Sequence, residues 1–219
     1  MNYLLQYPDR VMSLTLEHMK ISFVAVLVSV AIGVPIGILL TRWKFLQGPV
    51  ISIAGVLYTI PSLALFALMI PLFGLGMKPT IIALILYSQL AIILNTVSGI
   101  ETIDPSIIEA ATGMGMTGRQ LLLMIELPLG LPVIMAGVRM ITVMAIGIAT
   151  IASYIGAGGL GDLIFMGMFT VDIDKIIAGA LPLCILAILS DWLLVKLQKK
   201  LEVWRTDSQL INKNMVRGG

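Results

Sequence analysis

Few residues of this chain could carry chemistry, and their types exclude several reactions. His18 is the only histidine and Cys184 the only cysteine. Metal sites need several such ligands at short spacings, so we expect none here. A lone cysteine cannot form an intrachain disulfide, and Cys184 lies in an apolar stretch, so we expect it to pack as a small apolar residue. His18 lies beside Glu17 and close to Lys20, which favours a solvated or interfacial histidine over a functional one.

A second candidate is the glycine-rich run at residues 156–161, GAGGLG, which matches the G-x-G-x-x-G pattern. A dinucleotide site needs a preceding strand within a βαβ unit. The segment before this run is instead apolar enough for a membrane helix, so we expect a tight turn or re-entrant segment. The chain also lacks G-x-x-x-x-G-K-[ST], and therefore has no P-loop to bind ATP phosphates.

The third candidate is a charged stretch, residues 101–126, between apolar segments. Its central part, residues 109–128, reads EAATGMGMTGRQLLLMIELP. Asp104 followed by Pro105 predicts a helix N-cap and first helical residue. Apolar residues then recur at helical spacing, and glycines interrupt them before a second amphipathic stretch at residues 119–125. The apolar residues are Ile107, Ile108, Ala111 and Met114, and the glycines are Gly113 and Gly115.

This pattern predicts a helix, a glycine turn and a second helix. The small side chains of Ala110 and Ala111 would let a partner approach closely, and Gly115 would allow a backbone turn that strains other residues. Composition alone favours an amphipathic segment at the membrane surface that binds nothing, because short amphipathic loops are common.

The elements that hold these residues are predicted to be membrane helices. The chain is 58% hydrophobic and 12% charged, with mean hydropathy +1.04, whereas soluble domains carry about 25% charged residues. A span needs roughly 20 apolar residues. We therefore predict an all-α polytopic membrane protein, with a transmembrane domain at residues 1–200 and a tail at 201–219. Its five predicted spans are residues 21–41, 50–73, 79–100, 131–153 and 176–195.

The 109–128 segment resembles the EAA loop of permease subunits of bacterial ATP-binding-cassette (ABC) importers. The family pattern is E-A-A, three residues, G, nine residues, I, one residue and L-P, and every fixed position matches. The resemblance implies a type I (MetI-like) permease fold and a cytoplasmic loop, residues 101–128, that docks a separate ATPase. The docking residues would be Glu109, Ala110, Ala111, Gly115, Ile125, Leu127 and Pro128. The chain would then be non-catalytic and hold no cofactor, with ATP and Mg bound by the partner ATPase.

Orientation follows from the placement of Lys and Arg. With the 101–128 loop in the cytoplasm, the cytoplasmic segments contain nine basic residues and the outer segments four. This asymmetry predicts an outer N-terminus and a cytoplasmic C-terminus in the plasma membrane of a bacterium.

Three further segments indicate which group of importer permeases the chain resembles: LYTIPSLAL at residues 57–65, NTVSGIETIDP at 95–105 and IGAGGLG at 155–161. They look like permeases of osmoprotectant importers, which carry glycine betaine, carnitine and choline. The implied partners are ABC ATPase subunits, a second permease subunit (the same chain or a paralogue), an extracytoplasmic substrate-binding protein and the lipid bilayer. No nucleic acid is implied. Permeases for another small polar solute, such as an amino acid, remain the alternative.

The residues themselves support a quaternary ammonium substrate weakly. Such cations are usually bound by an aromatic cage, and the aromatic residues of the spans are scattered. We take Tyr58, Ser62 and Tyr87 as candidate lining of the substrate pathway and expect tight binding to lie in the separate receptor. A secondary transporter would need acidic residues at the centres of its spans and often internal repeats, which are missing.

Small and charged residues inside the predicted spans leave alternatives open. Gly33 and Gly37 are four residues apart, as are Ala145, Ala149 and Ser153, which suits close helix packing within the chain, a subunit interface or a pathway. Arg139 and Asp191 either reach the membrane interface or serve function. Pro35 and Pro61 predict helix kinks.

Overall fold

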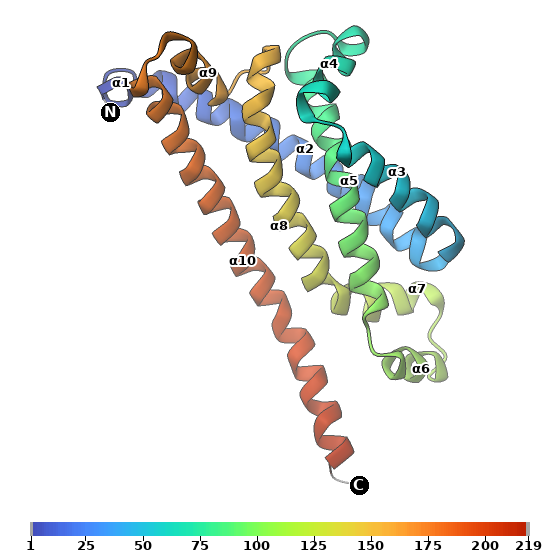
Figure 1. Cartoon of the computed structure of the whole chain (residues 1–219). Helices are drawn as coiled ribbons and strands as arrows, with labels where there is room; N and C mark the ends of the chain where they lie inside the picture. The colour runs from blue at the N-terminus through green and yellow to red at the C-terminus, as the bar shows by residue number, and fades with distance from the viewer. Residues whose placement is uncertain (1, 218–219) are drawn as a thin grey trace.

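The computed structural model describes the backbone of residues 2–217 and the side chains of residues 3–201, and this part of the chain is helical without strands (Figure 1). The predicted all-α fold is confirmed. The elements are α1 (Asn2–Gln6), α2 (Pro8–Arg42), η1 (Lys44–Leu46), α3 (Gln47–Thr59), α4 (Ser62–Phe73), α5 (Met77–Glu101), α6 (Pro105–Gly113), α7 (Gly118–Leu121), the π-helical η2 (Leu122–Glu126), α8 (Leu127–Ala152), η3 (Ser153–Ile155), α9 (Gly161–Thr170) and α10 (Ile173–Arg217).

Four helical segments are long and apolar enough to cross a membrane: Pro8–Arg42, Met77–Glu101, Gly118–Ile155 and Ile173–Leu201. They contain the predicted spans 21–41, 79–100, 131–153 and 176–195. Each helix is longer than its predicted span, because charged residues at the ends marked the prediction's limits without ending the helix. α2, for example, begins at Pro8, which is favourable at the first helical position.

The predicted span 50–73 is not one straight helix. It is divided into α3 and α4, which are bent by 98° at the break between them, and it makes a fifth span only if this pair is counted together. Ile60 is extended at the break, with φ −65° and ψ 128°. Pro61 explains this geometry, since proline has no N–H and disfavours the helical conformation in the residue before it.

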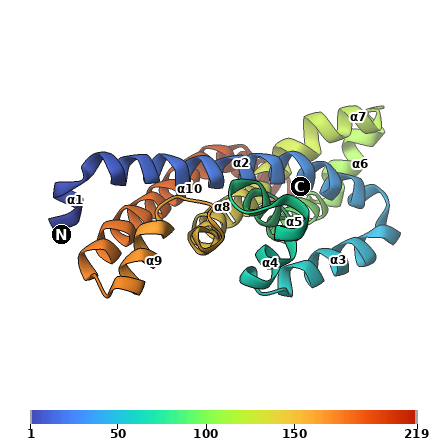
Figure 2. The ribbon, with the colours of Figure 1, turned by 90° about the horizontal axis from the view of Figure 1, so that it is seen from above.

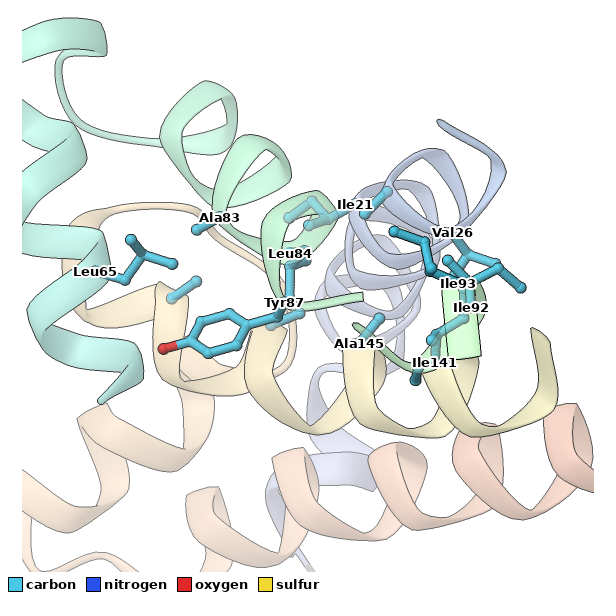
Figure 3. Packing of buried hydrophobic residues seen from close by; sticks show 14 of the residues in the cluster. Ile21, Val26, Leu65, Ala83, Leu84, Tyr87, Ile92, Ile93, Ile141 and Ala145 are labelled. Atoms are coloured by element: carbon cyan, nitrogen blue, oxygen red, sulfur yellow. The ribbon is translucent and has the colours of Figure 1, made fainter. Parts of the chain in front are cut away.

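The core lies where α2, α5 and α8 meet (Figure 3). Ile21 of α2, Leu84 and Ile92 of α5, and Ile141 and Ala145 of α8 are all fully buried there. The figure shows these side chains gathered between the three ribbons. The central layer thus fixes the relative positions of the helices that carry the candidate site.

Glycines let α2 lie directly against α5. A Cβ on Gly33 would come within 2.1 Å of Ile92 Cγ2, and one on Gly37 within 2.5 Å of Thr96 Cβ. Ala145 and Ala149 are likewise fully buried inside the chain. Of the alternatives open for these small residues, the structure therefore favours packing within the chain.

The end of the bundle that carries α1 and α9, here the α9 end, is closed by the glycine run. Gly156, Gly158 and Gly159 have positive φ values of 77°, 81° and 83°, so the run forms a turn and not a nucleotide-binding strand–loop–helix. The amide of Gly159 donates to Glu17 Oε2 at 3.0 Å. A tight turn was predicted here, but its contact with α2 was not.

Two expectations for single residues were wrong. His18 is fully buried, and its Nε2 lies 3.0 Å from the carbonyl oxygen of Ile146. The charged neighbours of His18 suggested solvent, but the histidine lies on the face of α2 that packs against α8. Cys184 is exposed on α10 instead of packed inside the chain.

Candidate functional site

The candidate docking loop joins α5 to α8 at the end of the bundle opposite α9, here called the α6 end (Figure 1). Asp104 caps α6 as predicted: its Oδ1 accepts from the amide of Ser106 at 2.9 Å and from its hydroxyl at 2.8 Å. These two hydrogen bonds hold the pKa of the Asp104 carboxyl below its ordinary value. The cap is therefore charged at neutral pH, and its contribution is lost when the pH falls through that lowered pKa.

The predicted glycine turn follows. α6 ends at Gly113, and Gly115 takes a left-handed conformation with φ +82°. The turn is closed by the amide of Met116, which donates to the carbonyl oxygen of Ala111 at 3.2 Å. Nothing lies within 4 Å of a Cβ built on Gly115, so the backbone conformation, and not space, demands glycine there.

The second loop helix, α7, begins with a capping box that our sequence analysis missed. The amide of Gln120 donates to Thr117 Oγ1 at 3.4 Å, and the amide of Thr117 donates to Gln120 Oε1 at 2.8 Å. A threonine followed three residues later by glutamine is the known signal of this motif. The capping box fixes the starting point of the helix that leads toward the membrane.

From α7 the chain runs through the five-residue π segment η2 into α8 without a break, so that Gly118–Ile155 is one continuous helical segment. The predicted second loop helix is thus the beginning of the same long helical segment that contains the fourth predicted span. π-helical turns are rare in proteins, and those that occur are often found at functional sites. A displacement of the loop would be transmitted directly along α8.

The residues predicted to dock a partner differ in exposure. Glu109, Ala110, Gly115 and Pro128 are exposed, and Ile125 and Leu127 are partly exposed. Ala111 is buried within this chain, at 2% exposure. Ala111 therefore presents almost no surface to a partner in this structure. The side chain of Met114 extends the exposed face instead, at 76% exposure.

A partly buried ion pair fixes the base of this loop. The two terminal guanidinium nitrogens of Arg42, Nη1 and Nη2, donate to the carboxylate of Glu126, with Nη1 3.0 Å from Oε1. Arg42 is the last residue of α2. Glu126 is 4% exposed. Nearby, Gln47 donates to Glu101 Oε1 at 2.8 Å. The Arg42–Glu126 pair was not predicted, because its partners are 84 residues apart and only the fold brings them together.

A second polar feature lies in the membrane region. A hollow of about 540 Å³ is bordered by Tyr58 of α3, by Arg139 of α8 and by Asp191 of α10. Arg139 donates through Nε and Nη2 to the two carboxylate oxygens of Asp191, with Nη2 3.2 Å from Oδ2. These charges therefore pair with one another, which neither of the sequence interpretations had anticipated.

The three candidate pathway residues are not equivalent. Tyr58 borders the hollow, and its ring meets that of Tyr87 edge to face at 6.3 Å between centroids. Tyr87 is buried beneath it and donates its hydroxyl to the carbonyl oxygen of Ile60, at the α3–α4 break. Ser62 is the first residue of α4, beyond that break. Tyr87 thus supports Tyr58, and the fold brings these two together without Ser62.

Known proteins resemble the chain over most of its length. A family model described as "Binding-protein-dependent transport system inner membrane component" matches residues 33–203. The choline transport system permease protein OpuBB of Bacillus subtilis is 46% identical over 187 residues, covering 85% of this chain and 86% of that protein. The osmoprotectant import permease protein OsmW of Salmonella typhimurium is 46% identical over 202 residues, covering 90% of this chain and 94% of that protein.

Solved structures agree on the fold. A chain of the MetNI methionine ABC transporter, in an inward-facing conformation, superposes with a TM-score of 0.80 at 22% identity, covering 92% of this chain and 98% of that one. A chain of an amino acid ABC transporter superposes with a TM-score of 0.75 at 22% identity, covering 90% and 97%. The fold is that of these importer permeases, and the apolar helices make this a multi-pass membrane protein. The chain belongs to the family of binding-protein-dependent transport system inner membrane components.

Proposed function

We propose that this chain is the translocation subunit of an ATP-driven importer for quaternary ammonium osmoprotectants: glycine betaine, carnitine and choline. The substrate class is supported by the relatives, among them the glycine betaine/carnitine/choline transport system permease protein OpuCB of Bacillus subtilis, 45% identical over 84% of this chain. A closely similar permease for another small solute, such as an amino acid, is the alternative.

The observation that carries the mechanism is the continuous helix from the loop into the membrane. A separate ATPase would bind α6 and the residue that follows it, where Ala110 and Met114 are exposed. ATP and Mg would be held by that ATPase, and its closure would move α6 and α7 together. Because α7, η2 and α8 form one helical segment, and the Arg42–Glu126 pair joins its base to α2, this movement would reach α8 and α2, two of the three core helices, and alternate the access of the pathway.

The remaining partners follow from this mechanism. A second permease subunit would complete the pathway, and an extracytoplasmic substrate-binding protein would deliver the substrate at the α9 end. Tight recognition would belong to that receptor, because the permease must release its substrate in every cycle. Tyr58 and Ser62 would line the pathway, with Tyr87 behind Tyr58.

The proposal is tested by uptake of labelled glycine betaine, carnitine and choline in a bacterial strain that lacks this permease and is then complemented with it. Complementation should restore uptake of at least one of the three compounds, and an ATPase should co-purify with the permease. Uptake of an amino acid such as methionine in place of all three would favour the alternative. Failure of any ATPase to co-purify would contradict the importer mechanism.

A further inference from the structure

The hollow at Tyr58, Arg139 and Asp191 contains a charged pair and an aromatic ring that have no role in the candidate docking loop. Arg139 lies at the midpoint of α8, far from both ends of that helix. Charged residues in the middle of membrane helices are costly and often mark substrate pathways. The side chains of Arg139 and Asp191 are still 42% and 34% exposed, so both charges remain accessible from the hollow.

The hollow lies on the face of α8 that the core does not use. Seen along the bundle, α3 and α4 lie on one side of α8, and α9 and α10 lie on the other (Figure 2). α2 covers the opposite face of α8, where apolar residues of α2, α8 and α10 line a separate groove. The Arg139–Asp191 pair therefore borders a hollow shared by α3, α8 and α10, and neither side chain is buried in the packed interior.

We propose that this hollow is a transit site for quaternary ammonium zwitterions, in which Arg139 takes the carboxylate and Asp191, together with the Tyr58 ring, takes the ammonium group. This inference rests on the proposed function, and it names the place where the substrate is held during translocation. The hollow measures about 540 Å³, within the range of roughly 300–1,000 Å³ found for small-molecule sites.

Each end of a zwitterion finds a suitable partner here. Only two of the five guanidinium N–H groups of Arg139 donate to Asp191, so donors remain for a second carboxylate. An aromatic face and a carboxylate are the two groups that attract quaternary ammonium. The remaining wall is apolar, and its methionines, Met140 and Met144, present soft side chains to N-methyl groups.

Arg139 and Asp191 already neutralise one another, so a substrate can bind between them only if it replaces the partner of each. Removing one partner of such a pair leaves an uncompensated charge, which is strongly unfavourable. A zwitterion replaces both partners at once, so Arg139 and Asp191 can separate without either being left unpaired. α10 is suited to this movement, because only 11% of its most apolar window is buried, against 28–56% in the other long helices.

A specificity rule follows for the permease itself. Choline is a cation without a carboxylate, so it can pair with Asp191 but leaves Arg139 without a partner. Glycine betaine satisfies both charges. Arg139 therefore determines the preference for zwitterions over cations at this site, and Asp191 is needed for both.

The test uses the complete importer, with ATPase and receptor, reconstituted in vesicles. Uptake of labelled glycine betaine and choline is compared at saturating receptor, so that changes between variants report on the permease. Arg139→Gln should lower the betaine-to-choline uptake ratio about tenfold, as expected for one lost charge-assisted hydrogen bond. Asp191→Asn should lower uptake of both compounds. The double variant Asp172→Asn with Lys175→Gln, which removes the partly exposed ion pair at the α9 end, is the control and should leave the ratio unchanged.

The double variant Arg139→Gln with Asp191→Asn separates a site from a structural ion pair. Its neutral side chains leave no uncompensated charge, so the protein should insert and keep receptor-stimulated ATP hydrolysis, yet lose the betaine preference. A wild-type ratio in this double variant, or in Arg139→Gln, would overturn the transit site while leaving the proposed function intact. Absence of uptake of both compounds by the wild-type importer would instead contradict the proposed function.

Discussion

At the scale of single residues, two arginine–carboxylate pairs connect helices that are distant in sequence. Arg42 and Glu126 hold the docking loop against α2, and Arg139 and Asp191 join α8 to α10 beside the hollow. Sequence analysis identified Arg139 and Asp191 as unusual charges within spans but treated them separately. Pairing depends on the rotation and spacing of helices, which hydropathy and charge patterns do not contain.

Glu126→Ala should destabilise the protein because it removes the buried carboxylate that accepts two hydrogen bonds from the guanidinium of Arg42. We expect a loss of about 2 kcal/mol in the free energy of unfolding, less than for a fully buried pair, because the Arg42 side chain is 40% exposed. Thermal unfolding of the purified permease measures this. Glu101→Ala, which removes an exposed acceptor of Gln47, is the matched control and should cost below about 0.5 kcal/mol. Equal effects of the two substitutions would show that the buried pair has no special weight.

Gly115→Ala should weaken ATPase docking through the backbone alone. Alanine in the left-handed conformation costs about 1–2 kcal/mol, and Gly115 has φ +82° with no side chain near its Cβ position. Co-purification of the ATPase and uptake should both fall, although the permease still inserts. Gly113→Ala, in the same loop with equal space but without a positive φ, should leave both unchanged. If Gly115→Ala behaves like Gly113→Ala, the conformation of the turn does not matter for docking.

At the scale of elements, the sequence predicted what depends on local composition. Four predicted spans lie within long apolar helices, and the Asp104 cap and the Gly115 turn are where the pattern placed them. The division of residues 50–73 into two helices was missed, because a charge-free run indicates that a segment is long enough to span a membrane but not whether the helix is straight. Pro61 indicated a kink there, and the 98° bend also depends on how α4 packs against α5 and α8. The continuity of α7 with α8 was not predicted, because the sequence changes from polar to apolar between them and this change was interpreted as the boundary between a loop helix and a span.

The contact of α2 with α5 should be sensitive to a single methyl group. Gly37→Ala places a Cβ 2.5 Å from Thr96 Cβ, and overpacking of this kind costs about 1–3 kcal/mol. Gly147→Ala, in α8 with open space around its Cβ position, changes helix propensity in the same direction. The difference in melting temperature between the two variants therefore reports the helix contact. A Gly37→Ala protein as stable as Gly147→Ala would show that α2 is not held this closely to α5.

At the scale of the whole molecule, the bundle has two distinct ends and one recessed side. The docking loop lies at one end, and α10 runs toward that same end (Figure 1). Several basic residues belong to the elements of this end: Arg42, which pairs with Glu126 at the base of the loop, Lys44 of η1, Arg119 of α7, and Lys196, Lys199 and Lys200 of α10. The opposite end carries α1 and α9. Between these two ends, the hollow at Tyr58, Arg139 and Asp191 is bordered by α3, α8 and α10.

This distribution predicts that the α6 end is cytoplasmic and the α9 end faces outward, because basic residues concentrate on the cytoplasmic side of membrane proteins. Single cysteines in a Cys184→Ala background test it with a membrane-impermeant maleimide. Thr170 at the end of α9 and Ser106 in α6 are both exposed, so both cysteine variants can react once the reagent reaches them. Thr170→Cys should be labelled in intact cells, and Ser106→Cys only after permeabilisation. Labelling of Ser106→Cys in intact cells would place the loop outside, where no cytoplasmic ATPase could bind it, and the proposed mechanism would fail with the orientation.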